Sequence, residues 1–217
     1  MRPLMLGHRG AGAAGHIAEN TLESFELCLE QGCDGFEFDV RRSADGHAVI
    51  CHDPIVGGLR TGGLRIDATP ARELGVPSLN DVLKRFSQRA FLDIELKVPG
   101  LESQVLASVS EHPPRRGFVV SSFLPEVLDR IQSLDPAVPI GFIFDRQNLT
   151  PPSHLDLAWT IPQLKLVSRE LVEEAHGSGE KIMVWTVNRA DDIQRLIDWG
   201  VDAVISDQTK VLGQPRS

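Results

Sequence analysis

Short apolar runs alternate with amphipathic segments along nearly the whole chain. The apolar runs are typical of β-strands, and they fall at residues 3–8, 35–41, 47–53, 90–97, 118–123, 138–145, 155–161, 181–187 and 202–206. The intervening segments carry apolar residues three or four positions apart, as amphipathic helices do, at 21–31, 79–86, 102–111, 126–133, 169–176 and 191–199. Strands that alternate with helices in this way predict a parallel sheet.

Nine predicted strands are one more than an eight-stranded β/α barrel contains. Residues 43–46 read Ser-Ala-Asp-Gly, a turn sequence too short for a parallel crossover, so the second and third strands are expected to be hairpin-like neighbours. We therefore predict a single-domain, distorted (β/α)8 TIM barrel over residues 1–217, with one irregular corner. Residues 54–76 show no clear element and contain five glycines, which is equally compatible with a functional loop and with a surface excursion.

Composition and charge narrow the possible partners. The chain is 41% hydrophobic and 24% charged, which excludes a disordered or low-complexity protein. A net charge of −8 argues against nucleic acid, whose phosphate backbone attracts basic surfaces. No apolar run approaches the roughly 18 residues of a membrane span, and residues 1–6 are too few for a signal peptide, so we expect a cytoplasmic protein. Nothing in the sequence indicates an oligomeric state.

A glycine pattern near the N-terminus offers a rival interpretation. Residues 10–15 match G-x-G-x-x-G after a predicted strand, as in nicotinamide-dependent oxidoreductases. In that motif a helix begins within the glycines and its N-terminus holds the pyrophosphate. Here Asn20 is the better N-cap, with Glu23 three residues later, so the glycines are expected to lie in an open loop. We expect this loop to bend sharply or to pass close to a ligand.

Carboxylates recur on one face of two predicted strands. Alternation places Glu37 and Asp39 on one face of the second strand, and Asp93, Glu95 and Lys97 on one face of the fourth. Strands of a β/α barrel are covered by helices, so carboxylates that point inward need a compensating partner. A hard divalent cation, Mg²⁺ or Ca²⁺, held by Glu37, Asp39 and Glu95 would supply it. A salt-bridge network with Lys97 is the alternative.

Two histidines are predicted at the edge of the barrel where ligands bind. His8 lies at the carboxyl end of the first predicted strand and His52 at the end of the third, and side chains at the carboxyl ends of barrel strands line the active site. A pair of histidines there can divide the roles of acid and base. Arg9 supplies a planar set of donors suited to phosphate, and Lys97 a compact cation.

Six motifs occur in one order along the chain: His8-Arg9-Gly10, residues 19–25 (ENTLESF), residues 37–40 (EFDV), His52-Asp53, residues 95–97 (ELK) and residues 185–188 (WTVN). Together they resemble the glycerophosphodiester phosphodiesterase family, from residue 4 to about Asp207. Trp185 occupies a position that lies near the substrate in this family.

The resemblance implies a distorted TIM barrel of the phospholipase-C-like phosphodiesterase type. It also implies metal-dependent hydrolysis of a small glycerophosphodiester to sn-glycerol 3-phosphate and an alcohol. By this resemblance Glu37, Asp39 and Glu95 are metal ligands, His8 and His52 the acid/base pair, and Arg9, Lys97 and Trp185 substrate contacts.

One departure from the family pattern and two alternative functions bear on this resemblance. The segment 54–76 is shorter than the insertion usual in the family, so the metal and phosphate chemistry carries over more directly than the substrate preference does. A related phosphodiesterase or lyase that acts on lysophospholipids is the alternative function, because it would use the same metal and histidines. A nicotinamide-dependent oxidoreductase is less favoured, since it leaves His52, Glu95 and Lys97 without a role.

Overall fold

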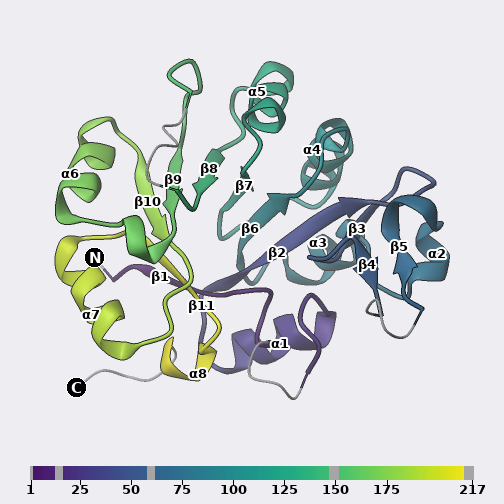
Figure 1. Cartoon of the computed structure of the whole chain (residues 1–217), viewed down its shortest axis with the longest axis horizontal. Helices are drawn as coiled ribbons and strands as arrows, with labels where there is room; N and C mark the ends of the chain where they lie inside the picture. The colour runs from purple at the N-terminus through teal and green to yellow at the C-terminus, as the bar shows by residue number, and fades with distance from the viewer. Residues whose placement is uncertain (1, 13–16, 58–61, 147–151, 213–217) are drawn as a thin grey trace.

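Eight parallel strands close into a barrel. The computed structural model describes residues 2–12, 17–57, 62–146 and 152–212. The barrel strands are β1 (Leu4–Gly7), β2 (Gly35–Arg42), β6 (Phe91–Leu96), β7 (Phe118–Ser122), β8 (Ile140–Phe144), β9 (Trp159–Pro162), β10 (Lys181–Val184) and β11 (Ala203–Ser206). β1 pairs in parallel with both β2 and β11, so the first and last strands complete the barrel (Figure 1). The predicted distorted (β/α)8 barrel in a single domain is confirmed.

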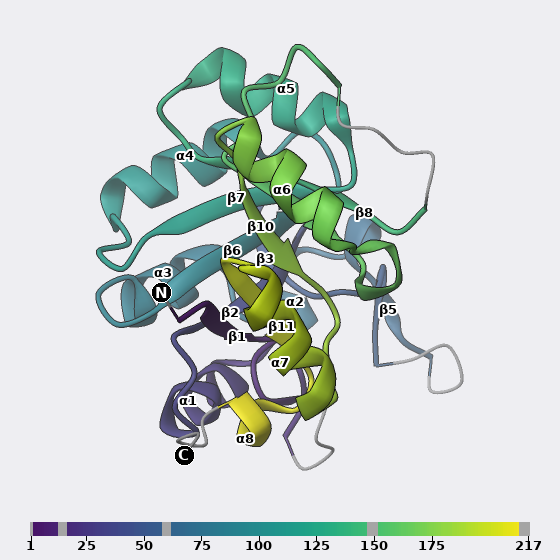
Figure 2. The same cartoon turned by 90° about the vertical axis from the view of Figure 1, so that its left-hand side faces the viewer.

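Helices surround the strands on the outside of the barrel (Figures 1 and 2). They are α1 (Leu22–Glu30), α3 (Leu79–Phe86), α4 (Glu102–Glu111), α5 (Pro125–Leu134), α6 (Arg169–Gly177), α7 (Ala190–Trp199) and α8 (Thr209–Leu212). The first six match the six predicted helices, whereas α8 is too short to show a helical period. Between β8 and β9 the described residues form no helix. Nowhere in the described part of the chain is a helix both long and apolar enough to cross a bilayer.

The irregular corner follows β2. β3 (Ala48–Ile50) pairs antiparallel with the last residues of β2, which confirms the predicted hairpin-like neighbours. Beyond it lie β4 (Ile55–Val56), β5 (Leu64–Arg65), a 3₁₀ turn (Ile66–Ala68) and α2 (Ala71–Leu74). Ile66 and Leu74 are buried against Val49 in a small core of their own. The prediction of no element over 54–76 is therefore wrong for its described residues, because this core stabilises short elements; residues 58–61 lie outside the description.

Alternation along β2 and β6 divides their side chains as predicted. Phe36 and Phe38 of β2 point outward and pack with Phe25 of α1 and Phe86 of α3. The rings of Phe25 and Phe36 stack with centroids 4.3 Å apart. Carboxylates of the same strands point inward, into a barrel whose interior also holds a cluster of buried apolar residues: Leu6, Phe91, Val119, Ile143, Trp159, Ile161, Met183, Ala203 and Ile205.

Gly35 permits the close approach of β2 to β6. Its backbone lies between Leu6 of β1 and Phe91 of β6 in the sheet. A Cβ added at Gly35 would lie 1.9 Å from the carbonyl oxygen of Phe91, a contact that only backbone movement can relieve. Because β2 and β6 carry the inward carboxylates, this spacing also sets where those carboxylates meet.

We expect Gly35→Ala to lower the free energy of unfolding by at least ~2 kcal/mol, because the added methyl group must push two barrel strands apart. Gly177→Ala is the matched control: no atom lies within 4 Å of its added Cβ. Since Gly177 is the last residue of α6, that change should leave stability unchanged or raise it by up to ~1 kcal/mol. Urea unfolding of the three proteins measures the difference, and equal stability of both variants would contradict the expectation.

Candidate active site

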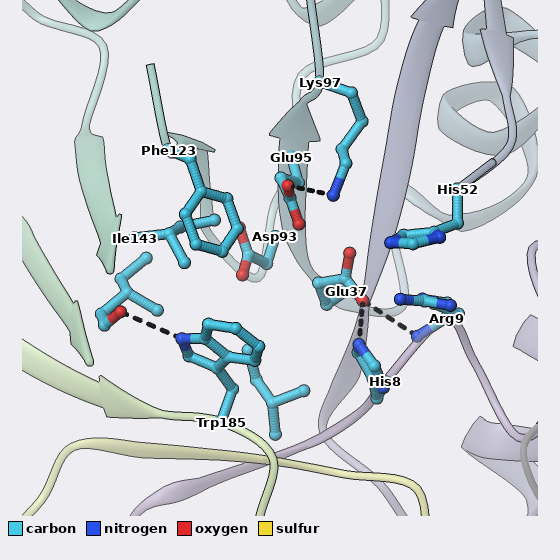
Figure 3. Close-up of a pocket in the computed structure, with 12 residues that line it drawn as sticks. His8, Arg9, Glu37, His52, Asp93, Glu95, Lys97, Phe123, Ile143 and Trp185 are labelled. Atoms are coloured by element: carbon cyan, nitrogen blue, oxygen red, sulfur yellow. Dashed lines mark hydrogen bonds and ion pairs between the residues drawn. The ribbon is translucent and has the colours of Figure 1, made fainter. Parts of the chain in front are cut away.

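A cavity of about 200 Å³ lies at the carboxyl end of the barrel strands. It gathers side chains that lie in or directly after each of the eight barrel strands, and Figure 3 shows the labelled ones converging on one space. Seven of the eight residues predicted from the sequence line it: His8, Arg9, Glu37, His52, Glu95, Lys97 and Trp185. The eighth, Asp39, is buried beside them and is ion-paired to both Arg9 and Lys97.

Three buried carboxylates form a possible metal site. Glu37, Asp39 and Glu95 each offer an oxygen, and these atoms lie within 4.8 Å of one another. They meet because β2 and β6 pair in register, with Asp39 opposite Glu95. Oε1 of Glu37 is buried without any hydrogen-bond partner among the described residues, so it is available to a ligand. An all-oxygen donor set of this kind suits a hard divalent cation.

Two cations partly offset the negative charge of the site. The ammonium of Lys97 lies 2.6 Å from Glu95 and 3.3 Å from Asp39. The guanidinium of Arg9 lies 3.3 Å from Asp39 and 2.9 Å from Glu19. Asp93 adds a fourth carboxylate to the three of the possible metal site. When all four are ionised, they exceed the charges of Arg9 and Lys97 by two, and Glu19 adds a further negative charge beside Arg9, so the site attracts a divalent cation.

Burial and neighbouring charges change the pKa values of several groups in the site. Burial, reinforced by Asp39 and Glu95, raises the pKa of Glu37 well above its usual value. Burial also raises the pKa of Glu95, against the opposing effect of Lys97, and raises the pKa of Asp93 to about 7. Although burial disfavours its charged form, Glu95 and Asp39 raise the pKa of Lys97. Glu37, Asp93 and Glu95 therefore resist ionisation unless further positive charge is present.

His8 is held by a carboxylate from the far end of the chain. Its Nδ1 lies 2.7 Å from Asp207, which follows β11. Although Asp207 is partly buried, hydrogen bonds from His8 and Asn188 lower its pKa, so it is ionised and can only accept. Nδ1 of His8 therefore donates, and Nε2, 3.9 Å from Glu37, is left to act in the cavity. Asn188 fixes Asp207 in turn through bonds to its side chain and its backbone N–H.

His52 reaches the cavity by a route that differs from the predicted one. The strand before it, β3, runs antiparallel to β2 and is not a barrel strand, so it returns the chain to the level of Asp39. The Nε–H of Arg41 donates to the carbonyl oxygen of His52 over 2.6 Å and fixes its backbone. Nδ1 of His52 lies 2.8 Å from a carboxylate oxygen of Asp53, so both histidines have a carboxylate beside Nδ1.

Asn20 is not the N-cap of α1, which corrects the prediction. Thr21 caps that helix in a reciprocal capping box with Ser24. Asn20 is buried with φ 56°, in the left-handed region, and its amide donates to Asp39 over 2.8 Å. The tertiary bond to Asp39 therefore outweighs the local capping preference, and Asn20 orients a possible metal ligand.

The described glycines do not form a dinucleotide-binding motif. α1 begins only at Leu22, so Gly10 and Gly12 do not open the helix as that motif requires; residues 13–16 of the pattern lie outside the description. Gly10 adopts φ 80° and packs against Ser24. The loop thus bends sharply, as expected, and places Arg9 beside Glu37, to which the Arg9 backbone N–H donates over 3.0 Å.

The wall of the cavity opposite the possible metal ligands is apolar. Trp185 donates its indole N–H to the carbonyl oxygen of Ile161 and meets Phe123 edge-on, with ring centroids 5.5 Å apart (Figure 3). Ile143 and Ile205 complete this wall. The cavity therefore joins a charged half, which can hold an ion and a phosphate, to an apolar half that can hold carbon.

Four residues of the site were not predicted from the sequence to belong to it. Asn20, Asp93, Asn188 and Asp207 all contact or neighbour predicted site residues. Asp93 shares a strand face with Glu95 and was therefore within reach of the alternation argument. The partners of Asn188 and Asp207 depend on barrel closure, which no local pattern reports.

Residues 8–211 match the model of the glycerophosphoryl diester phosphodiesterase family. The chain belongs to this family. It is 30% identical over 239 residues to a glycerophosphodiester phosphodiesterase of Caldanaerobacter subterraneus, an alignment that covers 98% of this chain and 97% of the relative. A Bacillus subtilis enzyme of the same name is 26% identical, with 94% and 83% of the two chains covered. The predicted family and the class of enzyme, a phosphoric diester hydrolase, are confirmed.

Solved structures agree with this assignment. A glycerophosphodiester phosphodiesterase of Thermotoga maritima superposes with a TM-score of 0.85 at 26% identity and covers 98% of this chain, with 97% of its own chain covered. A phosphodiesterase of Oleispira antarctica, solved in complex with the product sn-glycerol-3-phosphate, gives a TM-score of 0.83 at 29% identity, with 97% and 95% of the chains covered. The membership also excludes the nicotinamide-dependent alternative.

We expect the metal-free protein to lose stability as the pH rises from about 4 to about 7. Native Asp93 keeps its proton up to a pKa of about 7, whereas the unfolded chain releases it near 3.8. The native state binds more protons in this window, so the free energy of unfolding falls with pH, by on the order of 4 kcal/mol at most.

Asp93→Asn, which cannot titrate, removes this contribution and leaves those of Glu37 and Glu95. Urea unfolding in excess chelator at a series of pH values should therefore give a steeper decline for the wild type than for Asp93→Asn. Parallel curves, or a wild-type stability that increases with pH between 5 and 7, would contradict the expectation.

Proposed function

We propose that this cavity hydrolyses small glycerophosphodiesters to sn-glycerol 3-phosphate and an alcohol, with one divalent cation, Mg²⁺ or Ca²⁺. The observation that carries the proposal is the convergence of three buried carboxylates and two histidines on one cavity, in a chain of the glycerophosphoryl diester phosphodiesterase family. The product bound by the Oleispira antarctica relative supports the identity of the phosphate product. A cytoplasmic location remains a prediction from the sequence.

Glu37, Asp39 and Glu95 would hold the cation. When bound, the ion offsets negative charge on the phosphoryl oxygens. The chain prepares the ligands by hydrogen bonds: the Arg9 backbone orients Glu37, and Asn20 orients Asp39. Oriented ligands need not reorganise when an ion binds, which favours binding.

Arg9 and Lys97 would bind the phosphate. Both cations border the cavity and are 19% and 14% exposed, so a diester can reach them while water is largely excluded. Their ion pairs with the carboxylates keep both charges in place before substrate arrives. A singly charged phosphodiester can thus bind to a protein whose net charge is strongly negative.

His8 and His52 would transfer the protons. One takes a proton from the nucleophile and the other gives one to the departing alkoxide, which is the usual division between two positioned histidines. Nε2 of His8 is directed into the cavity by the bond between Nδ1 and Asp207. Asp53 can fix His52 in the same way. Two nucleophiles fit this arrangement, water and the neighbouring glycerol hydroxyl, and trapping of a cyclic glycerol phosphate distinguishes them.

Trp185 would contact the organic part of the substrate. Its ring and that of Phe123 form the apolar wall opposite the metal ligands. None of the described residues of segment 54–76 lines the cavity. This segment therefore offers few contacts that could select one alcohol over another.

Chelation should abolish release of glycerol 3-phosphate from glycerophosphocholine, and Mg²⁺ or Ca²⁺ should restore it. Glu37→Gln, which keeps the shape but loses the charge, should weaken cation binding in a calorimetric titration and lower kcat/KM at least ~10²-fold. The control is Glu102→Gln, another buried glutamate, which bonds the backbone of Gly100 outside the cavity. Circular dichroism establishes that both variants fold, and full activity in excess chelator would refute the metal role.

We expect His8→Ala and His52→Ala each to lower kcat by roughly 10²–10⁴-fold, the usual contribution of positioned proton transfer. A diester with 4-nitrophenol as the leaving group should rescue only the variant that lacks the general acid, because that alcohol departs without protonation. His176→Ala is the control. His176 lies outside the cavity and forms a comparable pair, in which its Nε2 is 2.9 Å from a carboxylate oxygen of Asp202. Unchanged hydrolysis of glycerophosphocholine by both site variants would disprove the assignment.

A further inference from the structure

Asp93 has a carboxylate oxygen without a partner inside the cavity. The residue is fully buried. Its Oδ1 accepts a hydrogen bond of 2.5 Å from the hydroxyl of Ser121, whereas Oδ2 has no hydrogen-bond partner among the described residues. A buried carboxylate oxygen that lacks a partner is costly, so this atom calls for a donor that the protein itself does not provide.

Asp93 lies deeper in the barrel than the possible metal ligand on its own strand. It stands two residues before Glu95 on β6 and pairs in register with Glu37 on β2 and Val119 on β7. Figure 3 shows it between the charged residues of the cavity and the apolar side chains Phe123 and Ile143. The group of oxygens close enough to share a cation contains Glu37, Asp39 and Glu95 but not Asp93.

The position of Asp93 determines whether the glycerol or the alcohol of the substrate can contact it. A glycerophosphodiester has one part that never varies, the glycerol, and one that does, the alcohol. The cavity that Asp93 lines is also lined by Ile143, Ile161 and Ile205 and has a volume of only about 200 Å³, so its buried part fits a group of fixed size, and the variable alcohol must point toward solvent. The glycerol therefore occupies the buried part, beside Asp93.

Of the two glycerol hydroxyls, the terminal one reaches farthest from phosphorus. The inner hydroxyl is one carbon nearer to phosphorus and would lie closer to the histidines and the possible metal ligands. We propose, on the basis of the proposed function, that Oδ2 of Asp93 accepts a hydrogen bond from the terminal glycerol hydroxyl and makes the enzyme selective for free glycerol. Asp93 is then a specificity-determining residue. Ser121 is a positioning residue that holds it.

The test compares two substrates that differ only in this hydroxyl. One is glycerophosphocholine and the other is its analogue in which the terminal CH₂OH is CH₃. The measured quantity is the ratio of their kcat/KM values, with Mg²⁺ or Ca²⁺ present. A partly folded or partly metallated variant loses the same factor on both substrates, so the ratio reports only contacts to the hydroxyl.

We expect the wild-type ratio to be at least ~10, because the analogue leaves the buried carboxylate unpaired. Asp93→Ala should reduce the ratio to within about threefold of one. Two neighbouring serines of β7 provide a matched pair of variants. Ser121 bonds Asp93, whereas Ser122 is also fully buried but bonds the backbone of Leu96 and Leu124. Ser121→Ala should lower the ratio, and Ser122→Ala should preserve it.

Each outcome decides the inference. A wild-type ratio near one overturns it, as does a ratio in Asp93→Ala as high as in the wild type, or equal ratios in the two serine variants. Should Asp93→Ala fail to fold, the wild-type ratio and the serine pair still decide. The absence of any glycerol 3-phosphate from glycerophosphocholine with wild-type enzyme and cation is a separate result, because it removes the proposed function itself.

Discussion

Negative charge buried inside a closed barrel is the constraint on which the site depends. The pairing of β2 with β6 brings four carboxylates together, Glu37 beside Asp93 and Asp39 beside Glu95. Burial of this much charge is costly unless cations and hydrogen-bond donors surround it. Arg9 and Lys97 supply two positive charges, and Asn20 and Ser121 supply donors. Negative charge that these groups do not compensate makes the site favour a cation and a polar substrate.

The barrel interior is divided between this charged half and an apolar half. β2 and β6 contribute the carboxylates, whereas β8, β9 and β11 contribute isoleucines that line the cavity and Trp185 follows β10. Apolar walls exclude water and so strengthen every electrostatic contact made to the phosphate. The same walls leave little room for the substrate to vary at its buried end. Charge and shape thus act on different parts of one diester.

The two histidines reach the cavity through the two places where the barrel departs from a simple repeat. His8 is held at the closure of the barrel, where β1 meets β11 and Asp207 follows the last strand. His52 is delivered by the antiparallel strand β3, which returns beside β2. Both irregularities bring a carboxylate to the Nδ1 side of a histidine. The acid/base geometry is therefore a consequence of how the sheet closes and turns.

The alternation of side chains along strands and the order of strands, helices and motifs were enough to predict much of this protein from its sequence. The strand period put Glu37 with Asp39 on one face of one strand and Asp93 with Glu95 on one face of another, and the short turn at 43–46 predicted the hairpin, because both are local properties of the chain. Contacts across the fold were not predictable in this way. Asn20 has the local signature of an N-cap, but its side chain bonds Asp39, and the pairing of His8 with Asp207 spans 199 residues. Such partners are fixed only when the barrel closes, since closure alone decides which distant side chains share one cavity.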